Sequence, residues 1–123
     1  MARVLLIEDQ PALRHLVAEV LREEGHDVLM ADDGSSGLAM LDLDAPPDLV
    51  LMDLFMPRVG GRAILAHLRG DPRLRSVPVV LMTGAMYDPA DFPPRGSYQA
   101  LLKKPFDLDE LTGAVRACLT SAE

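Results

Sequence analysis

The stretch DLVLMD at residues 48–53 follows Pro46-Pro47 and consists of four consecutive apolar residues between two aspartates. A short, continuous apolar run that is bounded by turn signals is typical of a strand buried on both faces of a sheet. The run therefore predicts a strand with Asp53 at its carboxyl end. Four further stretches are strand candidates, of which the last is the weakest: Arg3 to Ile7, Asp27 to Ala31, Pro78 to Met82 and Tyr98 to Leu102.

Apolar residues at helical spacing separate these strand candidates. Pro11 suits the first turn of one helix, and Asp32 or Asp33 can cap the next. Asp107 with Glu110 three residues later resembles a capping box that opens the last helix. The apolar stripes of the helices are Leu13, Leu16, Val17, Val20 and Leu21; Leu38 and Leu41; Ile64, Leu65 and Leu68; and Leu111, Val115 and Leu119. This alternation predicts one α/β domain over residues 1–123, with a parallel sheet covered by helices on both faces.

Length and composition narrow the class of protein. The 123 residues fit one domain with one core. A formal net charge of −7 means that most of the surface would repel the phosphate backbone of nucleic acid, so we expect no direct DNA binding. The longest apolar runs fall far short of the roughly 20 residues of a membrane span, and acidic residues interrupt the only early apolar stretch, which argues against a secretory signal. We therefore expect a cytoplasmic protein whose only cysteine, Cys118, packs in the core.

Chemically active side chains follow the strand candidates at the points where the strands end. Glu8 and Asp9 come after the first strand, and Asp53 ends the third. Thr83 follows the fourth strand, and Lys104 follows the fifth. Because the carboxyl ends of parallel strands meet at one edge of the sheet, where ligands bind in such folds, we expect these five residues to lie close together.

Three carboxylates at one edge repel one another, which raises their pKa values unless a cation compensates. Mg²⁺ prefers oxygen ligands of this kind. With the metal bound, Asp53 can attack a phosphoryl donor and form an aspartyl phosphate. Lys104 and Thr83 offer a cation and a hydroxyl donor to the phosphoryl oxygens. Taken alone, Glu8-Asp9 is explained as well by helix capping, but the presence of Asp53 favours metal binding.

Four motifs together resemble the receiver domain of two-component response regulators, over nearly the whole chain. They are LLIED at residues 5–9, DLFMP at 53–57 with Gly60-Gly61, TGA at 83–85 and KPF at 104–106. The resemblance implies a flavodoxin-like, doubly wound sheet of five parallel strands in the order 2-1-3-4-5. It also implies a sensor histidine kinase or a histidine phosphotransfer protein as the phosphoryl donor, Mg²⁺ as the cofactor, and a downstream protein target that the sequence does not identify.

The same resemblance assigns roles to individual residues. The implied metal ligands are Asp9 as a direct ligand, Glu8 acting mainly through water, Asp53, and the backbone carbonyl of Phe55. Asp53 is also the phosphoacceptor, Thr83 the switch hydroxyl and Lys104 the counter-cation of the phosphoryl group. A cis peptide bond is expected between Lys104 and Pro105.

Two positions depart from the family pattern. Leu101 stands three residues before the motif lysine, where receivers usually carry an aromatic residue that reports phosphorylation. The readout is then aliphatic, or it passes to Tyr98 or Tyr87. Residues 85–97 contain three prolines where the family places its fourth helix, and an interior proline costs a helix about 3 kcal/mol. We expect this helix to be short or irregular, and the segment to be loop-like until phosphorylation orders or moves it.

Three functions compete for these residues. The first is a receiver that acts alone by protein contact, since no effector domain follows Glu123. The second is a Mg²⁺-dependent phosphatase with an aspartyl nucleophile, but such enzymes place an acid/base Asp where this chain has Phe55. The third is a pseudo-receiver that binds partners without phosphorylation, against which the complete set of site residues counts. We expect a signalling domain that catalyses only its own phosphoryl transfer and slow autodephosphorylation.

Overall fold

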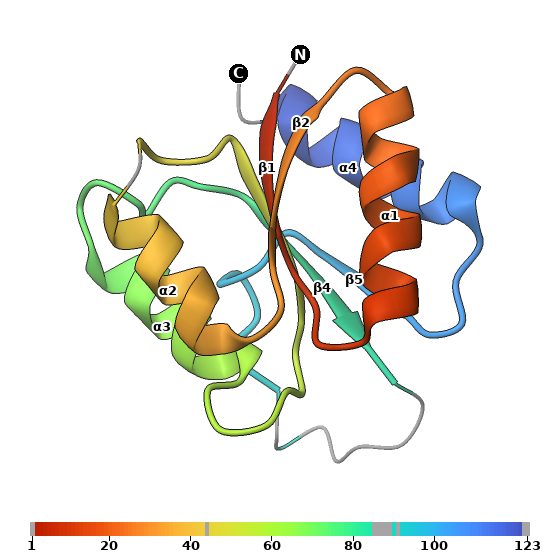
Figure 1. Cartoon of the computed structure of the whole chain (residues 1–123). Helices are drawn as coiled ribbons and strands as arrows, with labels where there is room; N and C mark the ends of the chain where they lie inside the picture. Colours follow the sequence, from red (N-terminus) through yellow and green to blue (C-terminus); the bar gives the residue numbers. More distant parts are fainter. Residues whose placement is uncertain (1, 44, 85–89, 91, 122–123) are drawn as a thin grey trace.

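The computed structural model describes residues 2–43, 45–84, 90 and 92–121, within which five strands and four helices follow one another (Figure 1). In chain order they are β1 (Arg3–Ile7), α1 (Pro11–Glu23), β2 (Asp27–Ala31), α2 (Gly34–Leu43), β3 (Leu49–Asp53), α3 (Gly61–Gly70), β4 (Val79–Thr83), β5 (Ala100–Lys103) and α4 (Leu108–Ser121). All five predicted strands are present, with boundaries that differ by one or two residues in β3, β4 and β5.

The strands form one parallel sheet in the order β2-β1-β3-β4-β5, as the resemblance implied. Ile7 of β1 pairs with Met52 of β3, and the next residue of β3, Asp53, pairs with Met82 of β4. Thr83 then pairs with Lys103 of β5. This register brings the carboxyl ends of β1, β3, β4 and β5 to one edge of the sheet.

Helices cover both faces of the sheet: α2 and α3 lie on one face, and α1 and α4 on the other (Figure 1). Alternate residues of β3 serve the two sides, because Val50 and Met52 belong to the core cluster beneath α2 and α3, while Leu49 and Leu51 belong to the cluster beneath α1 and α4. A strand buried on both faces needs an unbroken apolar run, which accounts for the stretch at residues 48–53. Among the described residues, no helix combines the length and the apolar character needed to cross a membrane.

The helix ends follow the predicted capping signals. The backbone N–H of Ser36 donates to the Asp33 carboxylate at 2.7 Å, so Asp33 caps α2. The predicted capping box is present at α4, where the Glu110 backbone N–H donates to Asp107 at 2.7 Å and the Asp107 N–H donates back to Glu110 at 3.4 Å. Gly25, with φ of 94°, adopts the left-handed conformation that ends α1.

A short or irregular helix was predicted between β4 and β5, before the element labelled α4, and only part of this segment is described. Residues 85–89 and 91 of this segment lie outside the described residues. Residues 92–99 form turns and bends rather than a helix. Leu101 and Tyr98 are half-buried and pack against the cluster beneath α2 and α3, whereas Tyr87 lies outside the described residues.

Candidate functional site

Three carboxylates meet at the carboxyl edge of the sheet. Glu8 and Asp9 follow β1, and Asp53 ends the adjacent strand β3. One carboxylate oxygen from each of the three lies within 4.8 Å of the others. Glu8 is fully buried, Asp53 is 6% exposed and Asp9 is half-buried. The predicted acidic cluster is therefore brought together, and it is largely shielded from water.

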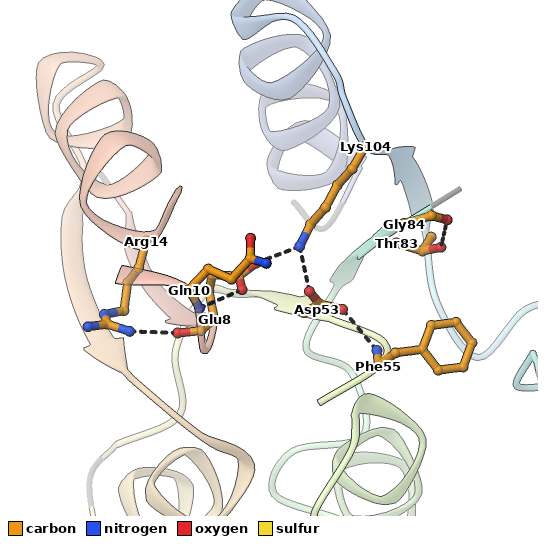
Figure 2. A network of polar contacts seen from close by, with 8 residues as sticks. All are labelled: Glu8, Gln10, Arg14, Asp53, Phe55, Thr83, Gly84 and Lys104. Atoms are coloured by element: carbon orange, nitrogen blue, oxygen red, sulfur yellow. Dashed lines mark hydrogen bonds and ion pairs between the residues drawn. The ribbon is translucent and has the colours of Figure 1, made fainter. Parts of the chain in front are cut away.

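Lys104, directly after β5, supplies a positive charge to this cluster (Figure 2). Its Nζ donates to Oδ2 of Asp53 at 2.5 Å and to Oε1 of Glu8 at 3.0 Å. Burial opposes the charge of Lys104, but the bonds and charges of Asp53 and Glu8 outweigh it and raise the pKa of Lys104 above its ordinary value. The peptide bond between Lys104 and Pro105 is cis, as predicted, and Lys103 is exposed.

Glu8 is held at each of its polar atoms. Its backbone N–H donates to the Ala31 carbonyl at 3.1 Å, and its Oε2 accepts from the Gln10 backbone N–H at 3.0 Å. The Arg14 guanidinium donates to the Glu8 backbone carbonyl at 2.9 Å (Figure 2). Burial is the largest influence on this side chain, and it raises the pKa of Glu8 above its ordinary value although Gln10 and Lys104 act in the opposite sense.

The turn after β3 orients Asp53. The backbone N–H of Phe55 donates to Oδ1 of Asp53 at 2.9 Å, while the residue as a whole is 44% exposed. Gly61 begins α3 directly behind this turn, where a Cβ atom would lie 2.8 Å from the Asp53 backbone oxygen. A glycine is therefore required for α3 to approach the site. The role of the Phe55 backbone carbonyl as a metal ligand stays a prediction.

Thr83 ends β4 at the same edge of the sheet, and its hydroxyl is hydrogen-bonded to the backbone. It is fully buried, and its Oγ1 donates to the Gly84 backbone carbonyl at 2.9 Å (Figure 2). The Lys104 backbone N–H donates to the Thr83 carbonyl at 2.7 Å. The backbones of these two predicted site residues are thus joined directly.

Sequence reasoning identified the charged residues of the site but not the groups that hold them. Arg14 and the backbone N–H of Gln10 were not predicted. Both lie where the chain enters α1, and Arg14 is one of ten arginines without a distinguishing motif. The sequence did indicate that Arg14 lies on the first turn of the helix that follows the acidic pair.

The donor set fits a hard divalent cation. Mg²⁺ takes oxygen ligands and is usually bound through one or two carboxylates together with water and phosphate oxygens. Glu8, Asp9 and Asp53 offer three carboxylates, two of which share the Lys104 ammonium. A cluster with this excess of negative charge is stabilised by a bound cation.

The sequence of this chain is similar to proteins of a known family. Residues 4–116 match the model of the response regulator receiver domain. The transcriptional regulator RpaA of Synechocystis sp. is 39% identical over 97% of this chain, which spans about half (49%) of that relative's length. Protein PilG of Pseudomonas aeruginosa is 32% identical over 97% of this chain and 88% of its own length.

A solved structure shows the same fold. The signal receiver domain of a signal transduction histidine kinase from Syntrophus aciditrophicus superposes with a TM-score of 0.86 at 27% identity, covering 98% of this chain and 92% of that one. Receiver domains generally bind Mg²⁺ at an acidic pocket and interact with histidine kinases or phosphotransfer proteins. The chain belongs to the response regulator receiver domain family, the phosphoryl-accepting signalling domains of two-component systems.

Proposed function

We propose that Asp53 of this chain accepts the phosphoryl group, from a phosphohistidine on a histidine kinase or a phosphotransfer protein. The observation that carries the proposal is the position of Lys104, whose Nζ contacts both Asp53 and Glu8 at the carboxyl edge of the sheet. The Asp53 carboxylate is thereby oriented at this edge, with its charge balanced by a cation. It can therefore act as a nucleophile.

The transfer replaces one bond of phosphorus by another. A carboxylate oxygen of Asp53 attacks the phosphorus atom, a P–O bond forms, and the P–N bond to the donor imidazole breaks. The imidazole nitrogen leaves with the electron pair of that bond. Lys104 then pairs with the phosphoryl oxygens as their counter-cation, and the Thr83 hydroxyl donates a hydrogen bond to one of them. Water later releases the phosphoryl group slowly, so the domain acts as a timed signal and not as an enzyme with an external substrate.

Glu8, Asp9 and Asp53 would hold Mg²⁺ in this proposal, with the Phe55 backbone carbonyl as a further ligand. When bound, the ion neutralises charge on the transferring oxygens. Glu8 is already bonded through both carboxylate oxygens, to Gln10 and to Lys104, which supports an indirect role for it. Asp9 and Asp53 are then the direct carboxylate ligands.

An apolar groove beside the site supports a protein as the phosphoryl donor. Its volume is about 470 Å³, and it runs from Lys104 between the first half of α1 and the start of α4. Leu16 and Leu108 line it and are 47% and 43% exposed, so together they offer apolar surface that a partner protein can bury. We propose that the phosphorylated domain then signals by contact with another protein.

The test uses a small donor, because the partner kinase is not identified. The protein is incubated with acetyl phosphate and Mg²⁺, and its intact mass is followed with time. We expect a gain of one phosphoryl group that disappears after the donor is removed. Asp53→Asn should abolish the gain, whereas the control Asp27→Asn, which removes an exposed carboxylate at the opposite edge of the sheet, should not.

Each alternative outcome has a distinct meaning. A mass gain that persists in Asp53→Asn would assign the phosphoryl group to another residue and refute the proposal. No gain in the wild-type protein, together with no change of its amide NMR spectrum on adding beryllofluoride and Mg²⁺, would favour the pseudo-receiver.

A further inference from the structure

Arg14 lies next to the acidic cluster although it belongs to the helix that follows it. It stands on the first turn of α1 and is half-buried. Its Nη1 donates to the backbone carbonyl of Glu8 at 2.9 Å (Figure 2). The bond joins residues six apart in the chain and spans the whole connection between β1 and α1.

This connection is fastened at two points. The Gln10 backbone N–H binds the Glu8 carboxylate from one side, and Arg14 binds the Glu8 carbonyl from the other. Asp9, the half-buried member of the acidic cluster, lies within the segment that these two bonds close. The start of α1 has no side-chain cap, and Arg14 instead ties the first turn of the helix to the backbone of the connection.

We propose that Arg14 is a positioning residue that holds Glu8 and Asp9 in the arrangement that binds Mg²⁺. The inference rests on the function proposed above. Groups that orient metal ligands without touching the metal commonly contribute ten- to a hundredfold to metal affinity. Within the same site, the backbone N–H of Phe55 also orients a carboxylate without its side chain, by a hydrogen bond to Asp53.

Charge and positioning make opposite predictions for Arg14. A guanidinium close to a cation site repels the incoming cation, so removing it for electrostatic reasons alone would tighten Mg²⁺ binding. Removing a group that holds the ligands in place would weaken binding instead. The sign of the change in the dissociation constant therefore distinguishes the two.

The experiment is a Mg²⁺ titration of the full chain followed by amide NMR. Arg14→Met should raise the Mg²⁺ dissociation constant by about tenfold, and Arg14→Lys, which keeps a charged donor, should recover most of the affinity. The matched control is Arg22→Met. Arg22 also lies on α1 and also donates to a backbone carbonyl, that of Val28 at 3.1 Å, but at the other end of the helix. Arg22→Met should leave the dissociation constant unchanged.

Phosphorylation gives a second readout. With acetyl phosphate, the rate for Arg14→Met should be low at limiting Mg²⁺ and recover at saturating Mg²⁺, because the acceptor Asp53 is intact. If Arg14→Met does not fold, Arg14→Gln takes its place, since its amide stands on a shorter side chain than the guanidinium. An unchanged or smaller dissociation constant in the variant overturns the inference while the proposed function stands. A wild-type protein that does not bind Mg²⁺ refutes both.

Discussion

Replacing Arg69 by Met should destabilise the domain more than the replacement of an exposed arginine would. The guanidinium stands in the last turn of α3 and joins three segments. Its Nε donates to the Ser97 carbonyl at 2.9 Å, and its Nη1 to the carbonyls of Arg75 at 3.0 Å and Val77 at 2.8 Å. Its Nη2 donates to Oε1 of Gln99 at 3.2 Å. One side chain therefore holds the connection before β4 and the connection before β5.

The size of the effect follows from which of these bonds water can replace. The bonds to Arg75 and Gln99 are exposed, so water takes them over at little cost. The bonds to Ser97 and Val77 are partly buried, and each contributes about 1.5 kcal/mol, the lower end of the range for a charged donor. The guanidinium is half-buried, which lowers the pKa of Arg69 and offsets some of this gain. We expect a net loss of about 2–3 kcal/mol and a fall in Tm of about 10 °C.

The assay is urea unfolding followed by circular dichroism, with Arg95→Met as the control. Arg95 is an exposed arginine in a turn, so its replacement removes the same charge and should change the free energy of unfolding by less than about 0.5 kcal/mol. Hydrogen exchange should also show faster exchange at the start of β4 and β5 in Arg69→Met. A loss below about 1 kcal/mol, with exchange as in the wild-type protein, would refute the reasoning.

Two glycines form a matched pair: a Cβ at Gly34 would lie 2.1 Å from a backbone oxygen of the β3–α3 connection, so Gly34→Ala should cost about 2–3 kcal/mol in urea unfolding. Gly113→Ala, in α4 with open space around it, should instead gain about 0.5–1 kcal/mol. The Ser36 backbone N–H lowers the pKa of Asp33. The cap that Asp33 provides to α2 therefore stabilises the fold fully above pH 3.8 and is lost as the pH falls through the lowered pKa of Asp33. The stability difference between the wild-type protein and Asp33→Ala should therefore shrink below that pH. Burial raises the pKa of the Cys118 thiol, so a thiol reagent at pH 8 should modify it far more slowly in the native protein than in denaturant.

The parts of the fold that sequence predicted best are those buried on both sides. In β3 every residue is buried and the four that precede Asp53 face a core, so the apolar run marks the strand almost completely. In β5 the run is short, and its start depends on a contact that no periodicity reveals. The Val79 backbone N–H donates to the side chain of Gln99 at 2.7 Å, where a strand residue would normally supply a carbonyl. The strand therefore begins at Ala100, two residues later than predicted.

The charged residues of the site were predictable for a related reason. Parallel topology brings the ends of β1, β3 and β5 to one edge. A carboxylate or lysine at the end of such a buried strand is therefore expected to lie at that edge. The bonds that hold these residues could not be predicted, because they involve backbone atoms. The carbonyl of Glu8 and the N–H groups of Gln10 and Phe55 are common to every residue, and only the folded chain decides what they bind.

Thr83 connects the proposed chemistry to the segment that follows it. A hydroxyl has one proton to donate, and that proton is committed to the Gly84 carbonyl. If a phosphoryl group on Asp53 takes the proton, the Gly84 carbonyl loses its donor, while the bond from the Lys104 backbone N–H keeps the Thr83 backbone in place. The change then involves the Thr83 side chain and the Gly84 carbonyl. Because Gly84 is exposed, water can satisfy its released carbonyl, so the exchange costs little and a modest interaction with the phosphoryl group is enough to drive it.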